Sequence, residues 1–136
     1  EDLIAHYAAF GQDLGIAFQI RDDYLGVWGD ETRTGKSATS DIREKKKSYP
    51  VLVAFERATE TDRATLDALY GAESFSDADV DTVLDILART DAQAATDQIA
   101  RAYYDAALAH LEHTGAAPEA LVPIHEYAAF LLRRAY

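Results

Sequence analysis

The sequence predicts an all-α protein, and three observations support this prediction. Short runs that alternate apolar and polar residues, the signature of strands, are nearly absent. Alanine- and leucine-rich runs instead repeat with helical spacing, and glycine, proline or a capping residue separates them. Apolar residues make up 49% of the 136 residues, enough for one folded domain with its own core. We therefore expect an antiparallel helical bundle.

The first expected helix is the longest and covers Asp2–Trp28, with apolar residues that recur every three or four positions. A loop of small and polar residues, 29–40, follows it. Pro50 suits the first turn of the next helix, which continues through Val51–Thr59.

Four more helices are expected in the second half of the chain. They open at Thr61 or Asp62, at Ser76, at about Asp91 and near Pro118. The first of them ends near Gly71, and the third ends before Gly115. We expect the apolar stripe of the last helix, which includes Tyr127 and Phe130, to lie in the core.

The charge distribution favours a small anionic ligand over a nucleic acid. The net charge is −11, and a duplex-binding protein needs a basic face to neutralise phosphates. Six of the thirteen basic residues nevertheless fall between positions 33 and 47, which indicates a local anion site. No segment is apolar enough to span a membrane, and the absence of cysteine fits a cytoplasmic protein. Because the chain begins at Glu1 and contains no methionine, we expect it to be processed or part of a longer protein.

Two adjacent carboxylates, Asp22 and Asp23, stand in the otherwise apolar stretch FQIRDDYLGVWGD, where an unpaired charge would be costly. Helical spacing places six residues on one face, namely Gly11, Gly15, Phe18, Gln19, Asp22 and Gly26. The glycines leave bare backbone on this face. Two interpretations remain open: close packing of another helix, or the wall of a cavity into which Asp22 points.

Carboxylates without nearby histidine or cysteine suit a hard cation such as Mg²⁺, which proteins commonly hold together with substrate phosphates. The lysines downstream would then contact the phosphate oxygens. Taken alone, an acidic pair at a helix end or a run of lysines is usually a solvated surface. Taken together, they predict a magnesium–diphosphate site.

The stretch FQIRDDYLGVWGD, followed by TGKSATSDIREKKKSYPV, resembles the second aspartate-rich region of the trans-isoprenyl diphosphate synthases, the polyprenyl synthetase family. The resemblance implies the isoprenoid-synthase type of helical bundle. It covers nearly all of this chain but only the C-terminal part of the family's single domain. The family's first aspartate-rich motif, which lies upstream and binds further Mg²⁺, is absent from residues 1–136.

On the metal side, the resemblance implies that Asp22 ligates Mg²⁺ and that its neighbour Asp23 acts close by or through water. Asp41 opens the later motif and is implied to support the metal site from behind the direct ligands. Gly26 replaces the third aspartate of the family pattern, and Asp30 is implied at most to order the loop.

On the substrate side, the resemblance implies that Gln19 contacts the diphosphate or metal-bound water and that Phe18 lies near the prenyl chain. Lys36 and Lys46 match the lysines that bind diphosphate. Lys45 stands where the family pattern has glycine, so which of the three lysines 45–47 reaches the phosphate stays open.

The implied function is that of a prenyltransferase of isoprenoid biosynthesis, which condenses an allylic diphosphate with isopentenyl diphosphate. The isolated chain is expected to be inactive and to act as a homodimer or with the missing N-terminal portion. One face of the first helix would then lack its usual neighbours, and Leu14, Phe18 and Leu25 would be covered by another chain or by a rearranged partner helix. The alternatives are a non-catalytic small subunit, a degenerate homologue, or a fragment of a class I terpene cyclase. The residue triad that is usual in such cyclases does not follow Asp23.

His110 and His113 are spaced like metal ligands on a helix, but their place near its end favours a solvated last turn.

Overall fold

The computed structural model describes residues 2–29, 32 and 39–133, and all regular elements within them are helices. This confirms the all-α prediction. The helices are α1 (Asp2–Trp28), α3 (Ser40–Arg43), α4 (Tyr49–Arg57), α5 (Glu60–Gly71), α6 (Asp77–Arg89), α7 (Ala92–Glu112) and α8 (Pro118–Arg133). Among these helices, none is both long enough and apolar enough to cross a bilayer.

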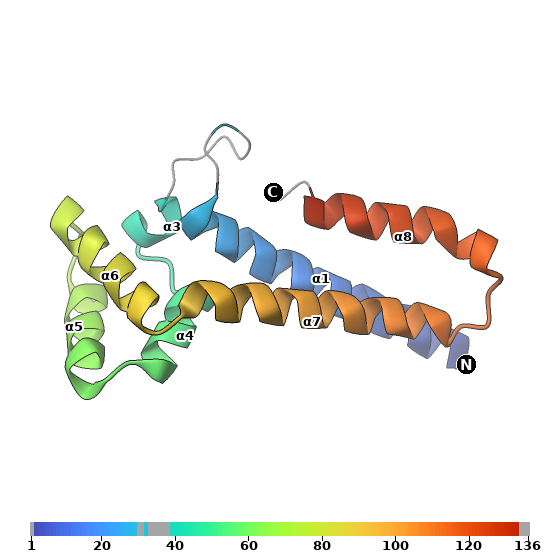
Figure 1. The fold of residues 1–136 in the computed structure, drawn as a ribbon, viewed down its shortest axis with the longest axis horizontal. Coiled ribbons are helices and arrows are strands. Elements are labelled where there is room, and N and C mark those ends of the chain that lie inside the picture. Colours follow the sequence, from blue (N-terminus) through green and yellow to red (C-terminus); the bar gives the residue numbers. More distant parts are fainter. Residues whose placement is uncertain (1, 30–31, 33–38, 134–136) are drawn as a thin grey trace.

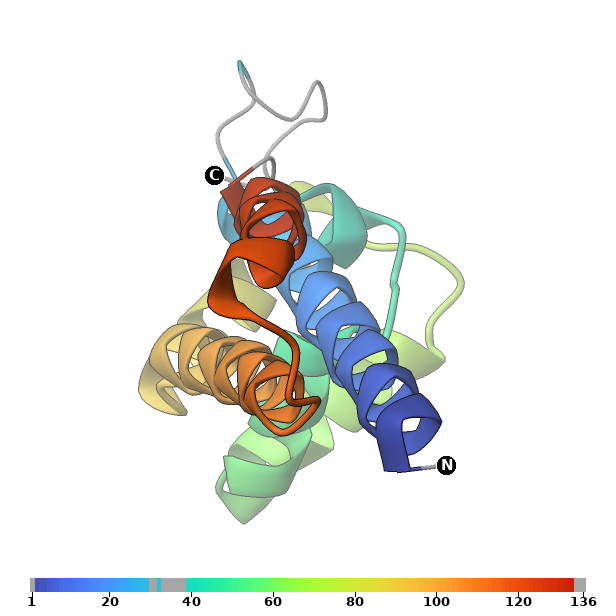
Figure 2. The same cartoon turned by 90° about the vertical axis from the view of Figure 1, so that its right-hand side faces the viewer.

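Two long helices, α1 and α7, form the central pair of the bundle. They run antiparallel and pack against each other over much of their length (Figure 1). The three helices α4, α5 and α6 gather at the end of the pair where α1 ends, and α8 returns beside α1 (Figures 1 and 2). The C-terminal end of α1 therefore lies next to α3 and α4, the helices that follow the basic loop.

The core has two parts. The larger part joins the end of α1 to α3–α6 and the start of α7, through residues such as Val27, Ile42 and Leu66. The smaller part joins α1, α7 and α8 around Leu14 and Ala107. Of the two kinds of cover expected for Leu14, another chain or a helix, helices of this chain supply it: α7 and α8 leave Leu14 7% exposed.

Local signals placed most helix ends correctly. The first helix was predicted at its observed bounds, and the Ser76 side chain caps α6 in a reciprocal pair with Asp79. The start of α5 was predicted too late: Thr59 is its cap, because the Thr59 hydroxyl accepts a hydrogen bond from the Asp62 N–H. Thr59 therefore does not belong to α4, which ends at Arg57.

The outer face of α8 differs from the prediction. Tyr127 and Phe130 were expected in the core but are 60% and 52% exposed. The reason is that α8 packs mainly on α1 through its other face, which carries Leu121 and Ala128. Within the described residues nothing covers the outer face.

Candidate functional site

The end of α1 presents its two adjacent carboxylates to different surroundings. Consecutive residues of a helix point about 100° apart, so Asp22 and Asp23 cannot face the same neighbour. Asp23 points toward the start of α4 and is only 7% exposed, whereas Asp22 is half-buried and stays in contact with solvent. Asp22 is therefore the more accessible of the two for a ligand.

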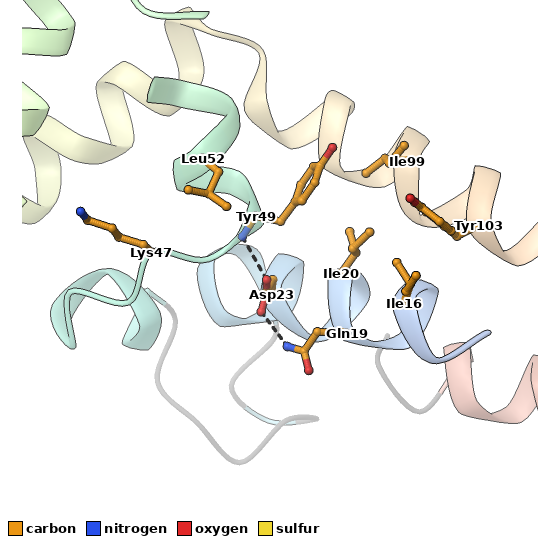
Figure 3. A pocket seen from close by; sticks show the side chains of 9 residues that line it. All are labelled: Ile16, Gln19, Ile20, Asp23, Lys47, Tyr49, Leu52, Ile99 and Tyr103. Carbon is orange, nitrogen blue, oxygen red and sulfur yellow. Dashed lines mark hydrogen bonds between the residues drawn. The ribbon is translucent and has the colours of Figure 1, made fainter. Parts of the chain in front are cut away.

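Asp23 joins three elements through hydrogen bonds. Its Oδ1 accepts from the Gln19 side chain at 3.0 Å and from the Lys46 ammonium at 3.1 Å. Its Oδ2 accepts from the backbone N–H of Tyr49 at 3.0 Å (Figure 3). Free N–H groups of a first helical turn favour such an anionic partner. The buried charge is thus compensated by a cation, an amide and a helix start.

Lys46 lies among the acidic residues of the site. Its ammonium is 3.1 Å from an Asp23 oxygen and 3.6 Å from an Asp41 oxygen. Partial burial alone would lower the pKa of Lys46, but the hydrogen bond and charge of Asp23, with the charges of Asp41 and Asp22, outweigh burial and raise it. Lys46 is therefore a cation in this site at neutral pH.

The neighbouring lysines point elsewhere. The Lys45 ammonium lies over the Phe75 ring, 5.6 Å from its centroid, and the Lys47 ammonium lies 5.9 Å from the Phe55 centroid. Both distances are within the range of cation–π contacts. Of the three lysines that the sequence left undecided, Lys46 is the one that approaches the carboxylates.

A tight turn after α3 determines this direction. The Lys45 N–H donates to the Ile42 carbonyl and the Lys46 N–H donates to the Asp41 carbonyl, both at 2.9 Å. This is the Schellman arrangement, which requires a left-handed residue, and Lys45 supplies it with φ 59°. The family pattern has glycine at this position, so the sequence contained a signal for the turn.

Asp41 approaches α1 from the side of α3. The residue is 6% exposed, and its carboxylate lies directly against Gly26. The Lys46 ammonium therefore contacts two carboxylates, those of Asp23 and Asp41.

The other predicted residues divide into two groups. Phe18 is half-buried, and Gln19 is exposed although its amide reaches Asp23. Lys36 and Asp30, predicted to bind diphosphate and to order the loop, lie outside the described residues.

A cavity of about 310 Å³ lies beside this cluster, between α1, α4 and α7. Its apolar lining includes Ile16, Ile20 and Ile99. Gln19 and Asp23 contribute polar groups, whereas the Lys47 ammonium points away from the cavity (Figure 3). An apolar hollow next to charged groups suits a ligand that has a charged head and a hydrocarbon part.

The site suits Mg²⁺ better than it suits a metal ion that is coordinated by protein ligands alone. In residues 2–29, 32 and 39–133, no three histidine, cysteine or acidic side chains are close enough to hold a metal alone. Magnesium usually keeps several waters and binds through one or two carboxylates plus substrate phosphates. The Asp22 carboxylate, which is half-buried and in contact with solvent, could be such a ligand.

The histidines of α7 serve the packing of the helices. His110 bonds the Asp13 carboxylate of α1 at 2.9 Å, and His113 bonds the Ala109 carbonyl and stacks on His6. His113 is exposed, as the solvated-turn interpretation predicted, whereas His110 is half-buried by its contact with α1.

The glycines of the predicted face differ from one another. A side chain added at Gly11 or Gly15 would meet nothing within 4 Å in the described chain, so no helix packs closely there. At Gly26 an added Cβ would overlap the Asp41 carboxylate.

Two contributions to the site were not predicted from the sequence. The sequence could have indicated the first of them, the backbone N–H of Tyr49. Tyr49 precedes Pro50 in the first turn of a helix, where N–H groups have no partner within the helix. The other is Arg21, which is 1% exposed and bonds Asp97 of α7 at 2.8 Å. No local pattern distinguishes this buried arginine from a solvated one.

The sequence of the chain matches those of known proteins. The sequence model of the Polyprenyl synthetase family matches residues 1–87. The chain is 36% identical over 111 residues to a geranylgeranyl diphosphate synthase of Saccharolobus solfataricus, covering 82% of this chain and 33% of that protein. It is 46% identical over 69 residues to a short chain isoprenyl diphosphate synthase of Methanothermobacter thermautotrophicus, covering 51% and 21%.

Solved structures give the same result for the fold. A putative geranylgeranyl pyrophosphate synthase from Corynebacterium glutamicum superposes with a TM-score of 0.81 at 31% identity, covering 100% of this chain and 40% of that one. A geranylgeranyl pyrophosphate synthase from the same organism, complexed with isoprenyl diphosphate and magnesium, gives 0.78 at 31% identity and covers 99% and 37%. The chain thus spans two fifths or less of these relatives' length. It belongs to the polyprenyl synthetase family.

Proposed function

We propose that this chain supplies one half of the active site of an isoprenyl diphosphate synthase, the half that holds the diphosphate of an allylic substrate together with Mg²⁺. The observation that carries the proposal is the meeting of Asp23 and Asp41 with Lys46, next to the accessible Asp22 and beside an apolar cavity. The named activity of the relatives and the isoprenyl diphosphate and magnesium bound to one of them support it.

The carboxylate oxygens of Asp22, with Asp23 next to it, would hold the metal. Lys46, and Lys36 from the basic loop, would contact the diphosphate oxygens, which are the partners that ammonium groups prefer. Lys46 would then exchange its present contact with Asp23 for the phosphate. Gln19 would bond the diphosphate or a metal-bound water.

Three other residues complete the proposed half-site. Phe18 would lie near the first isoprene unit of the substrate. Asp41 and Asp30 would order the lysines and the loop without binding the metal directly, and the buried position of Asp41 near Lys46 is consistent with that role.

The chemistry is the condensation of an allylic diphosphate with isopentenyl diphosphate. The bond between the allylic carbon and the diphosphate oxygen breaks, and its electron pair leaves with the diphosphate. The double bond of isopentenyl diphosphate supplies the electrons of the new carbon–carbon bond, and a proton is lost. Bound Mg²⁺ would neutralise charge on the departing diphosphate. The lysines add positive charge there, and the apolar surroundings exclude water.

We further propose that residues 1–136 are the C-terminal portion of a single all-α domain and are inactive alone. The active form would be a homodimer of the complete protein.

The test is turnover of an allylic diphosphate with isopentenyl diphosphate and Mg²⁺, measured on the isolated chain and on the complete product of its gene. In the complete protein, Asp22→Ala should lower kcat about 100-fold or more, because the metal loses a charged ligand. Asp67→Ala, which removes an exposed carboxylate on α5, is the matched control and should leave kcat unchanged.

The results distinguish the candidates. An active complete protein whose rate ignores Asp22→Ala would remove Asp22 from the site. A complete protein that binds a synthase subunit but turns over nothing would instead indicate the non-catalytic small subunit or degenerate homologue. Cyclised products from the allylic diphosphate alone would indicate a terpene cyclase.

A further inference from the structure

The approach of Asp41 to α1 depends on a glycine. Gly26 lies one helical turn after Asp22, and both Asp41 and Gly26 are buried. A Cβ built on Gly26 would overlap both oxygens and Cγ of the Asp41 carboxylate. The overlap involves the end of a side chain, so any residue with a Cβ at position 26 would displace this carboxylate.

The backbone of Asp41 is held by the turn after α3, and its side chain is linked to Lys46. Its backbone carbonyl accepts the Lys46 N–H at 2.9 Å, which closes the turn after α3. Its side chain lies 3.6 Å from the Lys46 ammonium, and Asp23 lies 3.1 Å from the same ammonium. A shift of Asp41 would therefore change the position of Lys46 as well.

Glycine is otherwise a poor residue for this place. Inside a helix it is less favourable than alanine, because it loses more backbone entropy and buries nothing. Gly26 is nevertheless followed by Val27 and Trp28 in the same regular helix. A requirement for close approach explains why a helix tolerates glycine here.

We propose that Gly26 is a positioning residue: it lets the Asp41 carboxylate lie against α1, where it holds Lys46 in register with Asp23. The family pattern has an acidic residue at position 26 as well as the aspartate that Asp41 matches, so glycine at position 26 leaves the place beside α1 to the Asp41 carboxylate alone. Restoring an aspartate at position 26 would displace Asp41 and weaken the site. This inference rests on the proposed function, since the register matters for holding diphosphate.

The experiment is a double-mutant cycle in the complete protein, with Gly26→Ala, Asp41→Ala and the two combined. Binding of inorganic diphosphate in the presence of Mg²⁺, followed by calorimetry, is the first measurement. Gly26→Ala should weaken binding roughly tenfold, as expected for a misplaced charge-assisted contact, and Gly26→Asp should weaken it as well. In the Asp41→Ala background, Gly26→Ala should cause little further loss.

Stability gives a second measurement that a general loss of structure would not reproduce. Gly26→Ala should lower the midpoint of denaturant unfolding in the wild type, because the new Cβ meets Asp41. In the Asp41→Ala background the same change should raise the midpoint, because only the helix preference of alanine remains. Gly71→Ala is the control, since an added Cβ there meets nothing within 4 Å in the described chain.

Each result has a definite meaning. The inference would be overturned if the wild type binds diphosphate but the losses of the two single variants simply add in the double variant. It would also be overturned if Gly26→Ala or Gly26→Asp binds diphosphate as well as the wild type does. In either case the proposed function would stand. A wild type that binds no diphosphate with Mg²⁺ would overturn the proposed function and the positioning role together. If Gly26→Ala still lowered the stability of the wild type and raised that of the Asp41→Ala variant, Gly26 would then act only in packing.

Discussion

Lys45 holds a backbone conformation that residues with side chains rarely adopt. Its φ of 59° belongs to the left-handed region, where the Cβ crowds the following carbonyl group. The turn needs this conformation because it brings the Lys46 N–H to the Asp41 carbonyl. The contact of the Lys45 ammonium with Phe75 compensates for only part of the cost.

Lys45→Gly should therefore stabilise the protein. Glycine enters the left-handed region freely, and we expect a gain of about 0.5–1 kcal/mol after the loss of the cation–π contact. Chemical denaturation of the complete protein measures the change. Lys47→Gly is the matched control, since Lys47 is not among the described residues with positive φ.

The control should lose stability, because glycine there adds freedom to the unfolded chain and removes the contact of the Lys47 ammonium with Phe55. A Lys45→Gly variant that is no more stable than the wild type would mean that the contact with Phe75 offsets the strain.

The pairing of α1 with α7 includes a charged contact whose arginine is buried. Arg21 of α1 is 1% exposed and bonds Asp97 at 2.8 Å, and Arg101 bonds the other oxygen of Asp97 at 2.9 Å. Burial alone would raise the pKa of Asp97, but the hydrogen bonds from Arg101 and Arg21, with their charges, lower it below its usual value. Because Arg21 adjoins Asp22, this contact also holds the carboxylates of α1 in place.

Asp97→Asn should destabilise the protein by about 2 kcal/mol at neutral pH, less than for a fully buried pair because Asp97 still contacts water. A lowered folded-state pKa means that the contribution is present above the unfolded-state value of 3.8 and is lost as the pH falls through the folded-state value. The difference between wild type and variant should thus disappear in acid. Urea unfolding at a series of pH values measures it.

Asp105→Asn, at an exposed position of the same helix, is the control and should change stability little at any pH. If Asp97→Asn were still less stable than the wild type by the same amount at the lowest pH, the shape of the contact and not its charge would hold the two helices together.

At the level of the whole molecule, the outer face of α8 is the most apolar surface of the bundle's C-terminal half. Val122, Tyr127 and Phe130 are 49%, 60% and 52% exposed. Exposed apolar side chains in a group mark surfaces that contact another part or another protein. Since the chain spans two fifths or less of its relatives, we expect the complete protein to cover this face.

Tyr127→Glu in the complete protein should therefore behave as a core substitution and lower stability by about 2–4 kcal/mol. Thermal unfolding measures the loss. Ala64→Glu, on the exposed side of α5, is the control and should stay within about 0.5 kcal/mol. Equal effects of the two variants would mean that Tyr127 faces solvent in the complete protein too.

Local chemistry predicted much of this fold, because helix starts and stops depend on near neighbours. The bounds of α1 and the cap at Ser76 follow from a few adjacent residues. The direction of Lys46 and the burial of Arg21 do not, because each depends on a partner from a distant element. The exposed position of Tyr127 was missed for the same reason: periodicity identifies an apolar face but not whether a neighbour covers it.

Trp28 gives the candidate site an optical reporter. It is the only tryptophan of the chain and stands in the last turn of α1, two residues after Gly26. Its ring centroid lies 5.1 Å from that of Tyr24, and it packs on the larger core cluster. When tryptophan is excited selectively, so that the tyrosines do not contribute, the fluorescence of this chain comes from one indole whose surroundings change when the end of α1 moves. Binding and unfolding at this end of the bundle can be followed by light emission without any attached label.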